Sequence, residues 1–227
     1  MSNNKQYVYV FFYIKAVNRI SLKESTFNVI YHQYLQWYPT KRELELFQSN
    51  QIEDIFIPRI LPSNAIEILL EEEEVRDSKQ PLHLLYKSNN TRDIWGKSIK
   101  VPTEEPFFAI SRKYEVVISS PLQLNDYPLD IQHLHIFFEA TSQSLKILPT
   151  IIYDKILVLE FGALASDPDY KFHKPVVEIN EFGEYANTYS CCTITLKLER
   201  KFTGKYKYLI IIIIVYNNSN NNLISNI

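Results

Sequence analysis

The chain has 227 residues, which is long enough to bury one sizeable core as a single domain. Its formal net charge of −2, from 24 Lys and Arg against 26 Asp and Glu, provides no basic field and excludes nucleic acid as an expected partner. Only 4 Gly accompany 16 Tyr and 13 Phe, a composition that favours β-strands and leaves few places for a glycine-rich phosphate loop.

The first predicted element is a strand that begins at Tyr7, after a disordered N-terminus of residues 1–6. Between Tyr7 and Val17 apolar side chains occupy both alternating faces, with Ala16 expected on the same face as Val8. This pattern is typical of an inner strand that is covered on both sides. No signal peptide is expected, because no small-residue cleavage site follows the apolar run.

The second predicted strand runs from Phe27 to Trp37, after turn residues at 18–24. On it, His32 and Tyr34 stand at odd spacing from Trp37 and are predicted to face the opposite side. The next segment, residues 41–48, fits a short helix or an edge strand equally well. Several further short strands separated by turn signals indicate an all-β sandwich.

An acidic run, Glu71 to Glu74, follows the sequence F-I-P-R-I-L-P-S-N-A of residues 56–65. Four adjacent carboxylates could attract cations, or they could form a solvated strand end, and both interpretations stay open. Further along, His133 and His135 share one strand face, but no third ligand has suitable spacing, so no metal is expected.

A stiff loop leads into the strand that carries these histidines. Residues 124–134 read L-N-D-Y-P-L-D-I-Q-H-L, in which Asn, Asp and Pro set a turn before the strand begins. In the last predicted strand, the alternation favours Cys192 as a small core residue over a vicinal disulfide with Cys191.

The C-terminal residues contain no complete transmembrane helix. Residues 209–215 are apolar, but seven residues are far fewer than the roughly 20 that span a bilayer. The Asn-rich residues that follow are expected to be disordered.

Taken together, these motifs resemble the ligand-binding domain of pentameric ligand-gated ion channels. Residues 127–132 resemble the signature loop, aromatic-Pro-apolar-Asp-x-Gln, and residues 56–65 are similar to the W-x-P and Asn-Ala motif, with Phe56 in place of the tryptophan. Residues 27–37 look like the second strand of the family, and residues 196–206 look like its final strand. The resemblance covers about residues 7 to 208.

In the animal receptors two cysteines close the signature loop, and Ser120 and Leu134 occupy their positions here. The chain therefore resembles the uncrosslinked, bacterial-like branch. This resemblance implies an immunoglobulin-like twisted β-sandwich of about ten strands over residues 7–208. Residues 209–227 would then be the truncated start of the first membrane helix and an Asn-rich tail, so that an extracellular domain is attached to the membrane through missing downstream helices.

The resemblance also implies a homo- or hetero-pentamer that binds a small molecule or an ion between neighbouring subunits, without a cofactor. Two aromatic positions of the acetylcholine site are occupied by Ser63 and Thr141, so a complete aromatic box is not expected. Ordinary packing of tyrosines is the alternative. The candidate ligand contacts are His32 and Tyr34 on one face, and Phe182, Tyr185 and Tyr189 around the predicted capping loop.

A further set of residues would couple ligand binding to the pore. The resemblance brings the loop between the first two strands, the signature loop and the terminal arginine together at the membrane face. We predict an ion pair between Asp130 and Arg200 there, although Asp130 could instead cap its own turn. The coupling candidates are Lys23, Glu24, Tyr127, Pro128, Leu129, Asp130 and Arg200.

The implied function is thus that of the extracellular ligand-binding domain of a channel subunit, coupled to a pore that this chain lacks. The alternatives are a soluble secreted ligand-binding or scaffolding β-sandwich, or an inactive truncated product. The sequence has no G-x-S-x-G elbow, phosphate loop or H-E-x-x-H motif, so we expect no enzyme.

Overall fold

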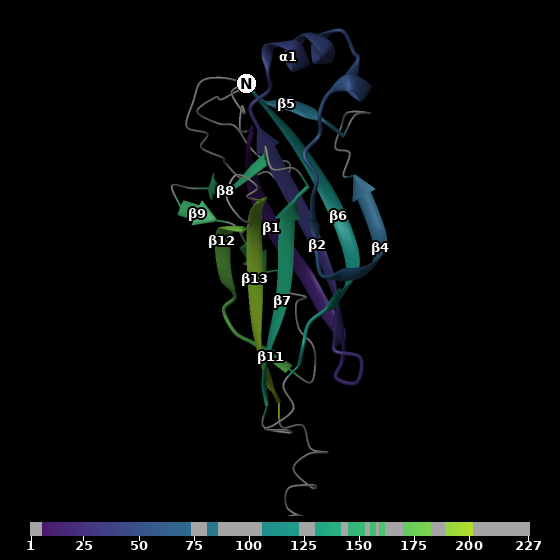
Figure 1. The fold of residues 1–227 in the computed structure, drawn as a ribbon, viewed down its shortest axis with the longest axis vertical. Helices are drawn as coiled ribbons and strands as arrows, with labels where there is room; N and C mark the ends of the chain where they lie inside the picture. Colours follow the sequence, from purple (N-terminus) through teal and green to yellow (C-terminus); the bar gives the residue numbers. More distant parts are fainter. Residues whose placement is uncertain are drawn as a thin grey trace, which may run out of the picture.

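Two β-sheets face each other in the computed structural model, and their inward sides enclose the main core (Figure 1). The structure describes residues 6–73, 81–85, 106–122, 130–141, 145–152, 155–157, 159–161, 170–182 and 189–201. The predicted all-β class is confirmed.

The larger sheet has eight strands and the smaller sheet has five. The larger sheet has the order β4 (Ala65–Glu73), β6 (Phe107–Ser119), β2 (Thr26–Trp37), β1 (Gln6–Ser21), β8 (Leu145–Ile152) and β9 (Lys155–Leu157), with β10 (Leu159–Phe161) beside β1 and β5 (His83–Leu85) beside β6. The smaller sheet has the order β11 (Tyr170–Phe172), β13 (Tyr189–Arg200), β7 (Ile131–Ala140) and β3 (Ile60–Pro62), with β12 (Val176–Phe182) beside β13.

The described residues contain thirteen strands, more than the expected number of about ten, because five of them are three-residue pieces. The eight longer strands carry most of the pairing between neighbours. Within the described residues, no helix has the length and apolar character of a membrane span. Residues 1–6 were predicted to be disordered, and this was wrong for Gln6, which begins β1 and pairs with Leu145 of β8. Residues 1–5 and the apolar and Asn-rich residues 209–227 lie outside the described ranges.

Strand β1 is an inner strand, as predicted. It pairs antiparallel with β2 on one side and parallel with β8 and β10 on the other. The prediction for Ala16 was wrong, because the pairing with β2 shifts between Ile14 and Ala16 and turns Val17 into the core instead. Such a β-bulge exchanges the two faces of a strand beyond it.

The core is built from alternating side chains of both sheets. Phe138 of the smaller sheet stacks on Phe12 of the larger one, with ring centroids 4.1 Å apart, and meets Tyr31 edge to face at 5.3 Å. Cys192 is fully buried in this core and both cysteines are free, so the core interpretation of Cys192 is confirmed. Burial, followed by the neighbouring Cys191, raises the pKa of the Cys192 thiol to about 12.

Residues 41–48 form a helix, α1 (Lys41–Gln48), which resolves the open choice between helix and edge strand. The Thr40 hydroxyl accepts a hydrogen bond from the Glu43 backbone N–H, and the Glu43 carboxylate accepts one from the Thr40 N–H at 2.7 Å. This reciprocal capping box stabilises the first turn. Phe47 then packs against Phe108 of β6, and a 3₁₀ turn, η1 (Ile52–Asp54), leads toward β3.

Candidate functional site

A buried ion pair joins the beginning of β7 to the end of β13. The Arg200 Nε donates to Asp130 Oδ1 at 2.8 Å, and its Nη2 donates to Asp130 Oδ2 at 3.2 Å. Only 2% of Asp130 is exposed. The predicted Asp130–Arg200 pair is therefore present, and its two-point geometry is the stronger kind of arginine–carboxylate contact.

Other side chains hold the two partners in position. Gln132 Nε2 donates to Asp130 Oδ2 at 2.5 Å, and the Arg200 guanidinium lies 4.8 Å from the ring centroid of Tyr170. The Arg200 backbone N–H also points to the Asp130 carbonyl at 3.5 Å. Burial by itself would raise the pKa of Asp130, but the hydrogen bonds from Arg200 and Gln132 and the Arg200 charge outweigh it and hold the pKa below its ordinary value near 3.8.

We expect the Asp130–Arg200 ion pair to make the free energy of unfolding depend on pH in the acidic range. Because the folded pKa of Asp130 lies below the unfolded value near 3.8, its contribution is fully present above that pH and is lost as pH falls through the folded pKa. The gap in free energy of unfolding between the native chain and Asp130→Asn should thus narrow as pH falls below 3.8. Urea unfolding at pH 7, 5, 4 and 3 measures it, and a gap that stays constant would contradict the assignment.

The ends of the segment that contains the predicted signature loop are joined by hydrogen bonds at Ser120 and His135. The Ser120 hydroxyl accepts a hydrogen bond from the His135 backbone N–H at 3.1 Å, next to Leu134. The Ser120 N–H in turn donates to the Ser25 carbonyl at 2.9 Å, in the turn between β1 and β2. These contacts connect the β1–β2 turn to the strand that follows the loop.

Asn64 strengthens the same region by bonding to both sheets. Its Nδ2 donates to the Ser119 and His135 carbonyls, each at 2.8 Å, and its Oδ1 accepts from the Phe137 N–H at 3.1 Å. The sequence identified Asn64 only as part of a motif, and its role as a tie between sheets was missed. An amide in a turn between two apolar runs was the available signal, because Asn offers both donors and an acceptor to nearby backbone.

The remaining coupling candidates divide into two groups. Lys23 and Glu24 are exposed in the β1–β2 turn, and the Glu24 N–H donates to the Ser21 hydroxyl at 3.3 Å. This turn lies at the same end of the molecule as β11 and the ion pair (Figure 1). Residues Tyr127, Pro128 and Leu129 lie outside the described residues.

The candidate ligand contacts lie on two different sheets. Tyr34 is only 1% exposed and packs with Phe11 and Phe107 in a small second cluster on the far side of the larger sheet, as its predicted orientation required. His32 is half-buried and meets the Tyr13 ring edge to face at 5.9 Å. Phe182 and Tyr189 are paired at one end of β12 and β13, whereas Tyr185 lies outside the described residues. Among the described residues, His32 and Tyr34 thus belong to the larger sheet, and Phe182 and Tyr189 to the smaller one.

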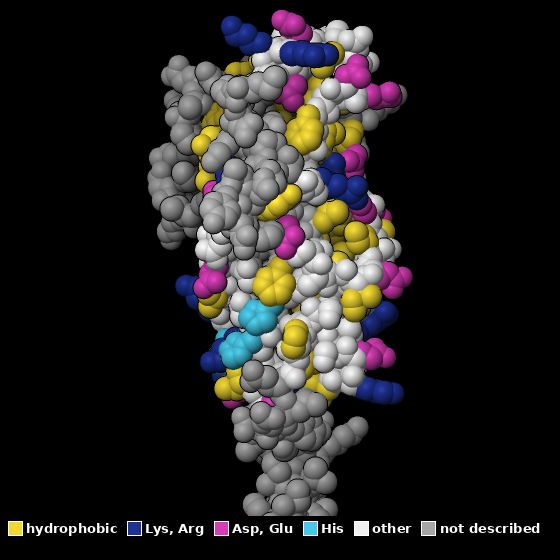
Figure 2. All heavy atoms as spheres, in the orientation of Figure 1, with side chains coloured by type: hydrophobic (Ala, Val, Ile, Leu, Met, Phe, Trp, Pro, Cys, Tyr) yellow, Lys and Arg dark blue, Asp and Glu magenta, His cyan; other side chains and the backbone are white. Residues whose placement is uncertain are grey.

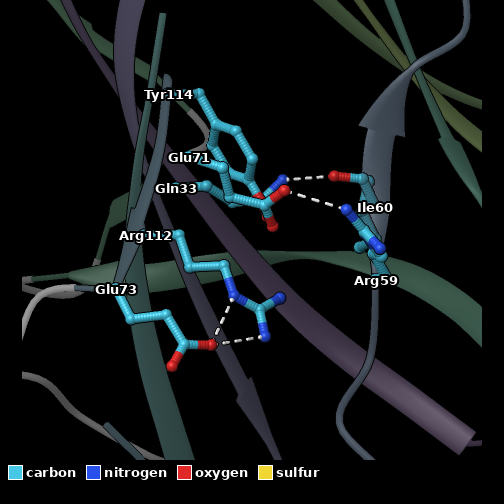
Figure 3. Close-up of polar contacts among 7 residues, drawn as sticks. All are labelled: Gln33, Arg59, Ile60, Glu71, Glu73, Arg112 and Tyr114. Carbon is cyan, nitrogen blue, oxygen red and sulfur yellow. Dashed lines mark hydrogen bonds and ion pairs between the residues drawn. The ribbon is translucent and has the colours of Figure 1, made fainter. Parts of the chain in front are cut away.

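Each described carboxylate of the acidic run on β4 bonds to an arginine, lysine or tyrosine side chain outside that strand. Glu71 accepts from the Tyr114 hydroxyl at 3.1 Å and from Arg59 at 2.9 Å, and Figure 3 shows it between these two side chains. Glu73 accepts from Arg112 at 3.1 and 3.2 Å (Figure 3). Glu72 forms an ion pair with Lys113 at 3.0 Å, while Glu74 lies outside the described residues.

This pairing favours a structural role for the three described carboxylates over that of free cation attractors. The Tyr114 ring stacks on Tyr31 with centroids 5.2 Å apart, so the polar contact of Glu71 reaches the edge of the main core. Burial raises the pKa of Tyr114 to about 12, with the Glu71 charge adding to the rise and Arg112 opposing it. Tyr114 therefore stays a hydrogen-bond donor to Glu71 at neutral pH.

The outer face of the smaller sheet carries histidine side chains beside hydrophobic ones (Figure 2). His135 stacks on Phe137 with ring centroids 5.8 Å apart, and its Nδ1 lies 3.1 Å from the Thr195 hydroxyl oxygen. Burial and the nearby His133 lower the pKa of His135, which favours the neutral ring. Among the described residues, no group of three or more His, Cys, Asp or Glu side chains is placed to hold a metal ion.

No known family model matches this sequence, and no curated protein matches it.

Proposed function

We propose that this chain is the extracellular ligand-binding domain of a pentameric ligand-gated ion channel subunit of the uncrosslinked type. In this proposal the two sheets form the immunoglobulin-like twisted sandwich of that family. Neighbouring subunits bind a small ligand or ion between them, and a rearrangement passes to membrane helices outside this chain. The motifs of residues 27–37, 56–65, 127–132 and 196–206 motivate the assignment.

The observation that carries the proposal is the buried ion pair between Asp130 and Arg200. Asp130 directly follows the tip of the predicted signature loop, and Arg200 ends the strand that would lead to the first membrane helix. A buried two-point contact makes these two segments move together, because separating them would leave a charge unpaired in the protein interior. Coupling a ligand site to a pore needs such a rigid connection.

The hydrogen bonds around Ser120 support the same assignment. They attach the β1–β2 turn, with Lys23 and Glu24 beside it, to the base of the predicted loop. Three segments distant in sequence therefore meet toward the end of the sandwich that carries the ion pair. In the proposed subunit this end faces the membrane.

Ligand contacts in this proposal come from the surfaces that remain accessible. Tyr34 is buried in its own cluster and would support the position of His32 rather than contact a ligand. Tyr189, which is half-buried, and the residues of the β12–β13 connection would supply the other side of the interface.

The test is the coding sequence that follows the codon for Ile227, together with the mass of the assembled chain. We expect the sequence to continue into four apolar spans, and the subunit to sediment in detergent as a pentamer. A stop codon directly after Ile227 and a monomer at every concentration would argue against a channel.

A second candidate function is a soluble secreted protein that binds a small ligand within one chain. It is favoured by a pocket of about 390 Å³ between the two sheets, which needs no neighbouring subunit. A monomer that binds small molecules, encoded without membrane spans, would support this alternative.

A further inference from the structure

A pocket of about 390 Å³ opens between the two sheets at the end of the sandwich opposite the Asp130–Arg200 ion pair. Strands β1 and β8 of the larger sheet form one side of it, and β12 and β13 of the smaller sheet form the other. This volume lies within the range of sites that hold small molecules. Among the lining residues are Tyr7, Lys146, Ile147, Ile179, Glu181 and Ser190.

Lys146 is the unusual residue of this pocket, because only 5% of it is exposed. Its ammonium nitrogen lies 2.7 Å from Glu181 Oε1, which makes an ion pair. Among the described residues, no second acceptor lies within hydrogen-bond reach of that nitrogen. An ammonium has three N–H donors, and buried donors are normally satisfied. The pocket thus contains unused donor capacity on a buried positive charge.

Glu181 supplies the opposite charge at the mouth of the pocket. Its side chain is 52% exposed, and it pairs across the sheet with Ser190. Ser190 is buried, and its hydroxyl accepts a hydrogen bond from the Ile147 N–H at 3.0 Å, which joins the two sheets at this point. The buried Lys146 ammonium and the more exposed Glu181 carboxylate therefore lie next to each other.

The rest of the wall is largely apolar. Ile147 is buried, Ile179 is partly buried against the main core, and Leu148 is half-buried beside them. Tyr7 is exposed and lines the pocket from the beginning of β1. An apolar body of moderate size could be removed from water here, while polar groups are recognised by Lys146 and Glu181.

We propose that this pocket binds a small zwitterion that carries a carboxylate, an ammonium group and an apolar body. The ligand carboxylate accepts hydrogen bonds from Lys146, and the ligand ammonium contacts the Glu181 carboxylate. The apolar body lies against Ile147 and Ile179. The site is contained in one chain and does not depend on a pentamer or a pore.

The charge arrangement favours a zwitterion over a simple anion or cation. The formal charges of Lys146 and Glu181 cancel, so an anion that reaches Lys146 also meets the repulsion of Glu181. A simple amine gains the Glu181 contact but gives the buried ammonium of Lys146 no acceptor beyond Glu181. A ligand with both charges contacts both side chains.

The test uses three matched probes on the full chain: L-phenylalanine, 3-phenylpropionate and 2-phenylethylamine. They share an apolar body and differ in whether they carry both charges, the carboxylate alone or the amine alone. Isothermal titration calorimetry is expected to detect L-phenylalanine, with each analogue at least about tenfold weaker. Chemical-shift changes should then be centred on Ile147 and Ser190.

Lys146→Met should weaken L-phenylalanine binding at least about tenfold, and Glu181→Gln should weaken it as well. Lys171→Met is the matched control, because it makes the same change at an exposed ion pair near the other end of β13 and should leave binding unchanged. Methionine keeps the buried stem of Lys146, so we expect this variant to fold. If it does not fold, Glu181→Gln, at a half-exposed side chain, decides the question.

Three results would overturn the proposal: no detectable binding of L-phenylalanine, binding of 3-phenylpropionate as tight as that of L-phenylalanine, or unchanged binding by Glu181→Gln. Failure here leaves the proposed channel function standing, because that function uses sites between subunits. Conversely, a stop codon after Ile227 would not affect the pocket. The two proposals therefore fail separately.

Discussion

Replacement of Arg200 with methionine is expected to lower the free energy of unfolding by about 3–5 kcal/mol. The variant leaves the Asp130 carboxylate buried without its two-point partner, and desolvation of that charge is then no longer offset. The contact between the guanidinium and the Tyr170 ring is lost as well. Urea unfolding at pH 7, followed by circular dichroism, measures the change.

Two further variants distinguish the effect of leaving a buried charge unpaired from the effect of removing any arginine. Arg59→Met removes a guanidinium from an exposed ion pair with Glu71 and should cost no more than about 1 kcal/mol. The double variant Asp130→Leu/Arg200→Met removes both charges and should recover a large part of the loss, because no unpaired carboxylate remains. Equal losses for Arg200→Met and Arg59→Met would show that burial of the pair contributes little.

The second large effect is expected at Phe138. Its ring is the contact through which the smaller sheet stacks on Phe12 and meets Tyr31 of the larger sheet. Phe138→Ala leaves a cavity between the sheets and should cost about 3–5 kcal/mol. The midpoint of urea unfolding should fall accordingly, while a similar slope indicates that the variant still folds cooperatively.

Phe137 provides a neighbouring control on the same strand. It points to the outer face, is 39% exposed and stacks on His135. Phe137→Ala removes the same atoms without opening a cavity in the core, so we expect a loss of about 1 kcal/mol or less. Comparable effects of the two substitutions would contradict the assignment of Phe138 as the main contact between the sheets.

The parts of the fold that follow from local alternation could be predicted from the sequence. Strand β1 has apolar residues on both faces, and it lies inside a sheet with one face in the main core and Phe11 buried on the other. Cys192 occupies one of the alternating buried positions of β13, and it is a core residue. The pairing of Asp130 with Arg200 was predicted from the family resemblance, because local patterns in the sequence cannot reveal a pair 70 residues apart.

Other features depend on pairing that one sequence cannot reveal. The shift at Ala16 results from a bulge in the pairing of β1 with β2, and nothing in the local alternation indicates it. Residues 41–48 were ambiguous because a short amphipathic segment fits both periods, although the capping box at Thr40 was present in the sequence as a helix signal.

The pocket around Lys146 was not predicted for the same reason. Lys146 and Glu181 belong to strands of different sheets, and each looks like an ordinary surface charge in its own segment. Their opposite charges become a candidate site only when β8 and β12 are packed against each other. Burial of a lysine, which is uncommon, is the observation that the sequence lacks.

The parallel pairing of β1 with β8 has a consequence for the order in which the protein can assemble during synthesis. Gln6 pairs with Leu145 and Val10 with Pro149, so β1 leaves the ribosome roughly 140 residues before this partner strand. At about 5–20 residues per second, β8 follows about 7–28 s later. During that time a nascent chain can form the β1–β2 hairpin, but the other edge of β1 stays open to pairing with other chains. The yield of folded protein would then depend on how well that edge is protected during synthesis, as well as on the stability of the finished sandwich.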